Sequence, residues 1–448
     1  MSLDFDESRD LDEPQDTGQD YEGIVRSKVE KAFRIKGFNP SLITSNEVAD
    51  FVVQSQSSKK KNKSEDLSLP SYLARSMAQL VLYLAQILKE GRDKFINEEL
   101  KDYVTLNNLG SKNIQKLAVP SIGLPAMFTC PGKSEFCRVA CYASRNRYGA
   151  QSTIISRFRQ LLATFTDEFW QNLPKKLGEM MEKKEMVERE AGKKNVFKDV
   201  RLHDSGDFFL LSSILDELYK DSEYLWEYLR GELYNGKGKA PSSESLNIDE
   251  VKKAIEELAG KPFDEIRSPE ELGDIIVNAF KRAVEILSGK PFDEIPDDYY
   301  VRKWGEVLNE LEKMGINVYT YTRAWRVPEL WESIKENLLP HKNFALMLSV
   351  DKTMPEEELR KAEEIRNEMK ELKKEMEEMG LNVGYNVDIA STGMDTELAG
   401  MSKKLANEMF VCPASVVEAV EKKAEKSCGE KCRYCFMANR PVLFVMHR

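Results

Sequence analysis

The sequence lacks long apolar runs and an excess of positive charge. Both absences limit the classes of protein to which the chain can belong. The longest apolar run, Met77–Leu88, is too short to cross a bilayer and is typical of a buried helix. The acidic N-terminus shows no signal peptide. With a formal net charge of −10, the chain as a whole is not attracted electrostatically to nucleic acid. We therefore expect a cytoplasmic protein without a membrane-spanning segment, and the overall charge does not indicate nucleic acid as a partner.

Common catalytic motifs are missing as well. The sequence has no P-loop, no G-x-G-x-x-G, no H-E-x-x-H and no nucleophile elbow. Its 7 cysteines instead form two tight groups. In the reducing compartment that we expect, such groups indicate metal binding or catalysis rather than disulfides.

The composition changes along the chain and indicates several regions. Residues 1–22 are rich in Asp, Glu, Gln and Ser and are predicted to be a disordered acidic tail. Residues 23–109 are predicted to be a helical N-terminal region, with a Lys- and Ser-rich linker near 54–66. Residues 110–448 are predicted to be an α/β metal-binding core, interrupted at about 221–300 by a helical insertion.

Short β-rich runs alternate with long amphipathic helices after residue 110. This alternation predicts an α/β fold, as a complete or partial parallel (β/α) barrel with helical insertions and a disordered acidic N-terminus. The predicted strands are Ile122–Thr129, Val196–His203, Asn317–Thr322, Phe344–Val350, Asn382–Ile389, Glu408–Val411 and Val442–Met446. The predicted helices are Pro70–Tyr103, Ile155–Phe165, Phe169–Met186 and Glu356–Met379.

The insertion contains a duplication. Val251–Ile266 reads VKKAIEELAGKPFDEI, and Phe280–Ile295 reads FKRAVEILSGKPFDEI. Two such units predict a repeated helix-and-turn hairpin. We interpret the insertion as a lid or as a surface that docks a protein partner.

The first cysteine group has the spacing C-x6-C-x3-C, formed by Cys130, Cys137 and Cys141. Three thiolates alone do not complete a tetrahedral zinc site. They suit a [4Fe–4S] cluster with one iron open, the arrangement that radical S-adenosylmethionine enzymes use to bind their cofactor. Two alternatives remain: a structural zinc site completed by His203 or a distant cysteine, and a metal-free thiol loop.

The second group consists of Cys412, Cys428, Cys432 and Cys435. Four cysteines, three of them close together, predict a closed four-thiolate site. The spacing suits zinc and a fully ligated iron–sulfur cluster equally. Such a site either fastens the C-terminal region to the core or serves as an auxiliary cluster.

Polar residues follow the second predicted strand as His203-Asp204-Ser205-Gly206-Asp207. A glycine lets a ligand approach the backbone closely. A carboxylate beside it can accept hydrogen bonds from the ammonium of a cofactor. Three roles are open to His203: it is a catalytic residue, a ligand to the open iron, or a structural histidine.

Further polar residues occur at or near the predicted ends of later strands: Arg323, Ser349, Asp351 and Asn386. The carboxyl ends of parallel strands meet at one edge, so we expect these side chains on a common functional rim. The guanidinium of Arg323 either binds a carboxylate or phosphate or forms a salt bridge at the end of the strand.

Several of these motifs resemble the phage protein family called gene product 88, in chain order over about residues 113–448. The matching segments are Asn113-Ile-Gln-Lys116-Leu117, Leu124-Pro125-Ala126, Thr129-Cys130-Pro131-Gly132, Cys137, Cys141-Tyr142-Ala143, His203-Asp-Ser-Gly-Asp207, Tyr321-Thr322-Arg323, Cys412-Pro413-Ala414, Cys428, Cys432 and Cys435. The resemblance implies a phage, plasmid or other mobile-element origin and a shared metal-site architecture. It implies no particular reaction.

The leading hypothesis is a radical S-adenosylmethionine-like iron–sulfur enzyme. The expected cofactors are a [4Fe–4S] cluster, S-adenosylmethionine, and iron–sulfur or zinc at the second site. We assign catalysis to His203, Asp204, Asp207 and Arg323, and binding of the cofactor and substrate to Ser205, Gly206, Ser349 and Asn386. The alternative is a non-catalytic zinc or iron–sulfur protein that docks a host or phage partner through residues 221–300.

Overall fold

A computed structural model describes most of the predicted core. The described residues are 69–99, 121–135, 137, 141–144, 149–190, 196–231, 247–351, 354–393, 410–411, 437–438 and 441–445. The predicted acidic tail and linker lie outside these residues. So do the four cysteines of the second group, Cys412, Cys428, Cys432 and Cys435.

A parallel sheet forms the centre of the fold. Its strands are β1 (Ser121–Ile122), β2 (Asp199–Leu202), β3 (Asn317–Thr322), β4 (Phe344–Asp351), β5 (Asn386–Gly393), β6 (Phe410–Val411) and β7 (Val442–Val445). They form a 7-stranded sheet in the order β1-β2-β3-β4-β5-β7-β6. Every pairing is parallel. The α/β prediction is therefore confirmed. Closure into a barrel stays a prediction, because no pairing joins β1 to β6 among the residues that the structure describes.

Each predicted strand overlaps an observed one, and the largest differences in limits are at β1 and β5. β1 ends at Ile122, since the chain turns away within the next residues and Met127 adopts a φ of 74°. β5 begins at Asn386, four residues after the predicted start. Tyr385, with a φ of 50°, donates its backbone N–H to the Leu339 carbonyl at 2.6 Å, outside the ladder with β4.

The predicted helices Ile155–Phe165, Phe169–Met186 and Glu356–Met379 are present, with boundaries that change by up to four residues. The predicted helix Pro70–Tyr103 is divided into two at Gly91, which has a φ of 82°, and residues 100–103 lie outside the described residues. The α-helices are α3 (Leu69–Glu90), α4 (Arg92–Glu99), α6 (Gln151–Ala163), α7 (Asp167–Glu190), α8 (Leu211–Leu229), α9 (Ile248–Ala259), α10 (Pro269–Ser288), α11 (Tyr299–Lys313), α12 (Pro328–Asn337) and α13 (Glu356–Glu378). Short 3-10 helices are η2 (Tyr142–Ser144), η4 (Phe263–Glu265), η5 (Phe292–Glu294) and η6 (Ala324–Arg326). None of the helices in the described part of the chain has the length and apolar character needed to cross a membrane.

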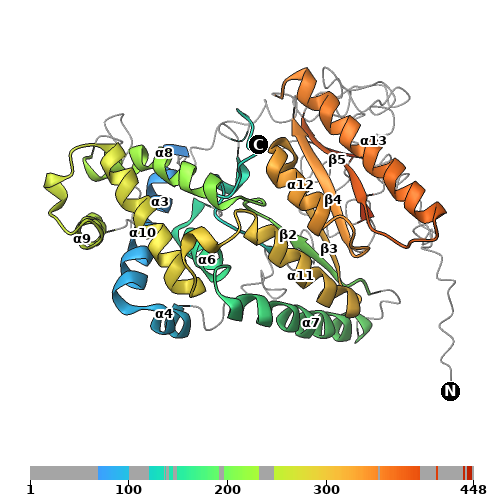
Figure 1. The fold of residues 1–448 in the computed structure, drawn as a ribbon, viewed down its shortest axis with the longest axis horizontal. Helices are drawn as coiled ribbons and strands as arrows, with labels where there is room; N and C mark the ends of the chain where they lie inside the picture. Colours follow the sequence, from blue (N-terminus) through green and yellow to red (C-terminus); the bar gives the residue numbers. More distant parts are fainter. Residues whose placement is uncertain are drawn as a thin grey trace, which may run out of the picture.

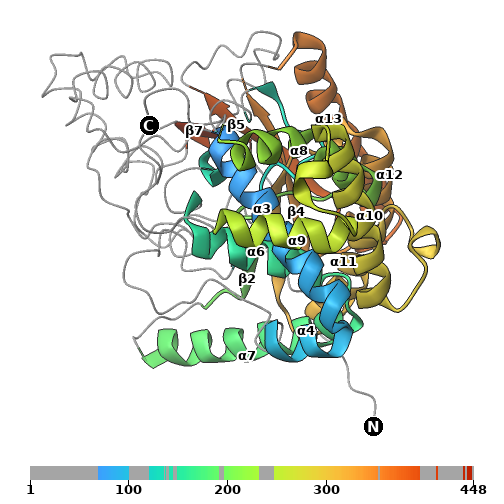
Figure 2. The same cartoon turned by 90° about the vertical axis from the view of Figure 1, so that its left-hand side faces the viewer.

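The helices form two groups (Figure 1). α11, α12 and α13 lie with the sheet, whereas α3, α4, α8, α9 and α10 gather on one side of the molecule. Figure 2 shows this second group from the front. α3, which comes before the sheet in sequence, packs against α8, α9 and α10. The N-terminal region and the insertion thus share one helical layer. The predicted domain boundaries remain predictions.

The duplicated segments form two similar units, α9 with η4 and α10 with η5. Each helix ends at a left-handed glycine, Gly260 or Gly289, with φ 69° and ψ 18° in both cases. In each unit a Glu side chain of the helix accepts the backbone N–H of the Phe that begins the 3-10 turn. These pairs are Glu256 with Phe263 and Glu285 with Phe292, at 3.0 Å in both units. The repeat predicted from sequence is therefore a repeat of local structure.

Candidate cysteine site at the carboxyl edge of the sheet

The first three cysteines occupy the loop that follows β1. Local turns shape this loop: Cys137 donates its backbone N–H to the Ser134 carbonyl at 3.0 Å, and Cys141 donates to the Cys137 carbonyl at 3.1 Å. All three cysteines are free and partly accessible. Since β1 is parallel to its neighbours, the loop lies at the carboxyl edge of the sheet, where the rim was predicted.

Contacts around Gly132 attach this loop to the end of β3. A Cβ at Gly132 would overlap the backbone carbonyl of Arg323, so the two chain segments touch. Arg326 donates from Nη1 to the Gly132 carbonyl at 2.7 Å. On the other side, Lys133 forms a buried ion pair with Glu217 of α8 at 2.5 Å. The cysteine loop is thus held between β3 and the helical layer.

The thiol groups interact electrostatically with one another. Burial, the negative charge of Asp207 and the other two thiols raise the pKa of Cys130 well above its ordinary value. Burial and the proximity of Cys137 raise the pKa of Cys141 to about 11, while Arg323 acts in the opposite direction. These raised pKa values favour the neutral thiol forms of Cys130 and Cys141.

Arg323 extends from the end of β3 to Cys137. Its Nη1 lies 2.8 Å from Cys137 Sγ and 2.7 Å from Asp351 Oδ2, and it also contacts the Ser134 hydroxyl. Ser134 in turn donates to Asp351 Oδ2 at 2.7 Å. Asp351 is the last residue of β4, and its side chain is fully buried. The predicted rim position of Arg323 is confirmed, and its contacts include the strand-end salt bridge that was one of its two alternatives.

Asp207 connects the loop after β2 to the end of β3. Its Oδ1 accepts the Thr322 hydroxyl at 2.6 Å and the backbone N–H of Phe208 at 2.8 Å. Its Oδ2 accepts the backbone N–H of Arg323 at 2.7 Å. Burial raises the pKa of Asp207 to about 6, even though these hydrogen bonds act to lower it. The side chain therefore fixes the segment that carries Arg323.

Asp204, Ser205 and Gly206 hold the loops after β1 and β2 together. Asp204 Oδ2 forms a buried ion pair with Arg157 of α6 at 2.8 Å and accepts the Ser121 hydroxyl at 3.1 Å. Ser205 donates from Oγ to the Leu124 carbonyl at 2.9 Å. Gly206 has a φ of 76°, and a Cβ there would overlap side-chain atoms of the loop after β1. The observed contacts of these residues are internal to the fold.

His203 lies in a cluster of aromatic side chains. Its Nε2 is 3.0 Å from the Tyr300 hydroxyl and its Nδ1 is 3.3 Å from the Thr320 hydroxyl. The ring of Phe208 meets it edge-on with centroids 4.6 Å apart. Burial lowers the pKa of His203 to about 3, which keeps the imidazole neutral. These contacts favour the structural alternative for His203 over ligation of a metal.

Ser349 and Asn386 lie at different ends of their strands. Ser349 is near the carboxyl end of β4, where its backbone carbonyl accepts Trp325 Nε1 at 3.3 Å. Asn386 is the first residue of β5 and pairs with Ala345 at the start of β4. Its Oδ1 accepts Lys373 Nζ at 2.8 Å. The predicted rim position of Asn386 is wrong. Because β5 starts later than predicted, Asn386 lies at the amino edge of the sheet, opposite the cysteines.

One neighbour of the cysteines was missed by sequence reasoning. Tyr72 lies in α3, far from the loop in sequence, and its side chain is buried. Burial is the main cause that raises its pKa, followed by the charge of Cys141. Its phenol is therefore close enough to the thiols to interact with them. No sequence pattern marks it, because it is one of many apolar-face residues of a long helix.

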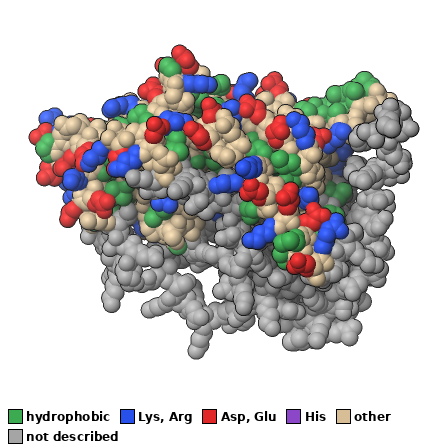
Figure 3. All heavy atoms as spheres, turned by 90° about the horizontal axis from the view of Figure 1, so that it is seen from below, with side chains coloured by type: hydrophobic (Ala, Val, Ile, Leu, Met, Phe, Trp, Pro, Cys, Tyr) green, Lys and Arg blue, Asp and Glu red, His purple; other side chains and the backbone are tan. Residues whose placement is uncertain are grey.

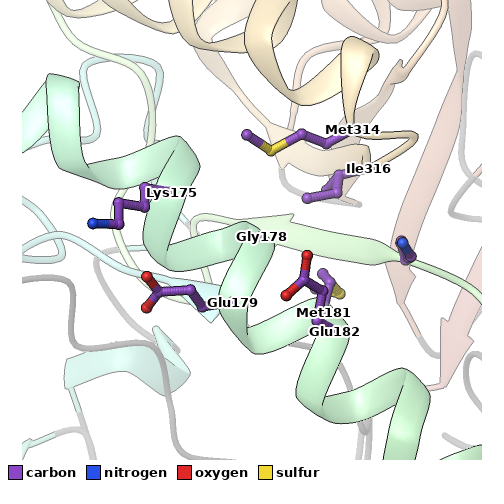
Figure 4. Close-up of a pocket in the computed structure, with 8 residues that line it drawn as sticks. Lys175, Gly178, Glu179, Met181, Glu182, Met314 and Ile316 are labelled. Atoms are coloured by element: carbon purple, nitrogen blue, oxygen red, sulfur yellow. The ribbon is translucent and has the colours of Figure 1, made fainter.

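The described residues contain no group of three or more His, Cys, Asp or Glu side chains placed so that it could hold a metal ion. The cysteine loop supplies three thiols, and one of them, Cys137, lies beside the Arg323 guanidinium. A pocket at the other edge of the sheet is lined by α7 and by Lys198 and Ile316, which precede β2 and β3 (Figure 4). None of the predicted site residues lines it.

The face seen from below carries positive and negative side chains mixed together (Figure 3). No region of one sign dominates the part of this face that belongs to described residues. Electrostatic attraction of nucleic acid requires such a region. Whether nucleic acid is a partner stays a prediction, as does the identity of any other partner.

The fold and the site define a parallel α/β protein with a three-cysteine loop at the carboxyl edge of its sheet. Residues 87–218 match the family model of gene product 88. The match includes the three cysteines of the loop and the segment from His203 to Asp207, so the resemblance is confirmed over this stretch. The motifs beyond residue 218 lie outside the match, and their resemblance stays a prediction. No curated protein and no solved structure matches the chain.

Proposed function

We propose that the chain is an iron–sulfur protein in which Cys130, Cys137 and Cys141 hold a [4Fe–4S] cluster at the carboxyl edge of the sheet. The observation that carries the proposal is the mutual electrostatic interaction of the three thiols beside the Arg323 guanidinium. Three thiolates are the donor set of a cluster with one iron open.

Burial is the main cause of the raised pKa values of Cys130 and Cys141, and the neighbouring thiols add to it. Each thiolate disfavours the others, and burial disfavours all charged forms. A bound cationic metal reverses both effects, so metal binding would release protons from these thiols. The sulfur atoms must also move together, since the described loop does not form a closed ligand group.

In the catalytic form of this proposal, Cys130, Cys137 and Cys141 would hold the cluster, which would supply the electron for reductive cleavage of S-adenosylmethionine. The chain's own residues position the site. Asp207 accepts three hydrogen bonds, and Asp204 is paired with Arg157. These carboxylates support the edge of the sheet, and they do so without any ligand. A cofactor ammonium would compete with these contacts.

This last observation favours a second candidate, a cluster protein that is not an enzyme. The predicted catalytic residues Asp204 and Asp207 and the predicted cofactor-binding residue Ser205 all make internal contacts. A cluster in such a setting transfers electrons or stabilises the fold. S-Adenosylmethionine separates the two candidates. It should perturb the electron paramagnetic resonance spectrum of the reduced cluster in the enzyme and leave it unchanged in the other case.

Metal analysis tests the proposal itself. The full chain is purified anaerobically, and iron, zinc and acid-labile sulfide are measured per chain. Replacing all three loop cysteines by serine should remove a defined share of iron and sulfide, whereas Thr129→Ser should remove none. Replacing Cys428, Cys432 and Cys435 by serine identifies the metal of the second group. Full retention of iron and sulfide without the loop cysteines would overturn the proposal, as would zinc without sulfide in the unmodified chain.

A further inference from the structure

We propose that Arg201, Tyr321 and Ser349 form a binding site for the carboxylate or phosphate group of a small-molecule ligand. The three residues lie on the adjacent strands β2, β3 and β4 (Figure 1). The site contains none of the cysteines and needs no metal. The inference therefore goes beyond the proposed function, and each of the two can fail without the other.

The pairing of the strands places the three side chains on one face of the sheet. Arg201 pairs with Tyr319, and Tyr321 is two residues further along β3. Tyr321 pairs with Met347, and Ser349 is two residues further along β4. Side chains at paired positions, and at positions two apart on one strand, point to the same face. Each step also moves towards the carboxyl edge, where ligands bind in parallel α/β folds.

The partly exposed positions of β2, β3 and β4 all lie on this face. Besides Asn317 at the amino end of β3, they are Arg201, Tyr321 and Ser349. Positions that point to the opposite face are fully buried, among them Val200, Leu202, Val318, Leu346 and Leu348. Solvent therefore reaches the sheet on the face, and towards the edge, where the three residues of the site lie.

Tyr321 holds the guanidinium of Arg201 in place. The central carbon of the guanidinium lies 5.0 Å from the centroid of the Tyr321 ring. Tyr319, which is only 2% exposed, meets that ring edge-on with centroids 5.9 Å apart. A cation above an aromatic ring is attracted to the ring without using its N–H donors. The arginine is thus positioned before a ligand arrives, which lowers the entropy cost of binding.

The chemistry of the three side chains defines the ligand. A guanidinium, a phenol and a hydroxyl can all donate hydrogen bonds, and the guanidinium carries a full positive charge. Arginine binds carboxylates and phosphates through two parallel N–H bonds. Burial and the positive charge of Arg201 together lower the pKa of His203, so this charge acts across the carboxyl end of β2. The complement of such a site is an anion rich in acceptor oxygens.

The test measures the binding of two probes, inorganic phosphate and benzoate, to the full-length protein by equilibrium dialysis at constant ionic strength. We expect saturable binding of one probe molecule per chain, and the tighter probe identifies the group as phosphate or carboxylate. Arg201→Gln should weaken binding about tenfold or more, because it removes a charged donor. Tyr321→Phe and Ser349→Ala should each weaken it about threefold to tenfold, because each removes one neutral donor.

Arg230→Gln is the matched control. Arg230 also lies over an aromatic ring, that of Trp226 at 5.1 Å, but it is at the end of α8. This variant should bind the probe as the unmodified chain does. Iron and zinc are measured in every variant, because equal metal content excludes a loss of binding through the cysteine site.

Two outcomes would overturn the inference and leave the proposed function untouched. One is the absence of saturable binding of either probe, and the other is equal affinity in Arg201→Gln and Arg230→Gln. If Arg201→Gln does not fold, Tyr321→Phe and Ser349→Ala decide the question, since both keep the charge and lose one donor. Unchanged affinity in these two variants would then overturn the inference.

Discussion

Asp207 and Arg323 are joined through the backbone: the Asp207 carboxylate accepts the Arg323 N–H at 2.7 Å. A side chain in the loop after β2 thereby fixes the end of β3. The state of that carboxylate should be visible in the stability of the protein.

The first prediction concerns pH. Burial raises the pKa of Asp207 from 3.8 to about 6 in the folded protein. The folded state therefore binds this proton more tightly than the unfolded state does. The stabilisation is complete below about pH 4 and is lost as the pH rises through about 6, on the order of 3 kcal/mol. Urea unfolding between pH 4 and 7 measures it. Asp207→Asn should lack this part of the pH dependence, and equal pH profiles for both proteins would contradict the prediction.

The second prediction concerns the buried ion pair of Arg157 and Asp204. Each of Arg157→Met and Asp204→Asn should lower the free energy of unfolding by about 3–5 kcal/mol, since the remaining partner is left buried. The double variant should lose much less than the sum. As a control, Lys303→Ala breaks a pair with the exposed Glu306 and should cost less than about 1 kcal/mol. Additive losses at Arg157 and Asp204 would show that the pair does not act as a unit.

The third prediction concerns the glycines that end the two repeated helices. Gly260 and Gly289 share the same left-handed geometry, and a Cβ at either position would meet no atom within 4 Å. Alanine should therefore cost only the backbone strain, about 1–2 kcal/mol at each site. The two losses should be equal within error by chemical denaturation. A clear difference between them would mean that the two units are not equivalent.

The fourth prediction concerns the contact between the cysteine loop and β3. Gly132→Ala places a methyl group against the Arg323 carbonyl, so the loop must move away from the strand. We expect lower iron content and lower stability. Gly178→Ala, within α7, is the control. The added Cβ would lie 3.4 Å from Met314, an ordinary contact distance, and the alanine should stabilise the helix by about 0.5–1 kcal/mol. Normal iron content in Gly132→Ala would show that the loop position does not matter for the cluster.

The sequence predicted the parallel sheet and the grouping of its polar edge, because alternating strands and helices leave little choice of topology. Arg323 and Asp207 lie where the strand ends indicated. Asn386 does not, because a displacement of β5 by four residues moves it to the other edge. Strand limits depend on individual backbone hydrogen bonds, such as that of Tyr385, which no periodicity reveals.

The use of each polar side chain was harder to predict than its position. His203 and Asp204 have the residue types of an active site, yet their partners are Tyr300 and Arg157, from distant helices. Tyr72 approaches the thiols for the same reason, through the packing of α3. Such contacts arise from tertiary packing between segments, and a linear pattern of residue types contains no record of them.

The order of the last strands sets an order of assembly during synthesis. β6 precedes β7 in the chain, yet β7 pairs with both β5 and β6. Within the described sheet, β6 has no strand beside it until β7 has left the ribosome. In a nascent chain that contains β6 but not yet β7, the edge of β5 lacks its native partner. Such an open edge invites pairing with other chains, and a chaperone or rapid translation of the intervening segment would shorten that exposure.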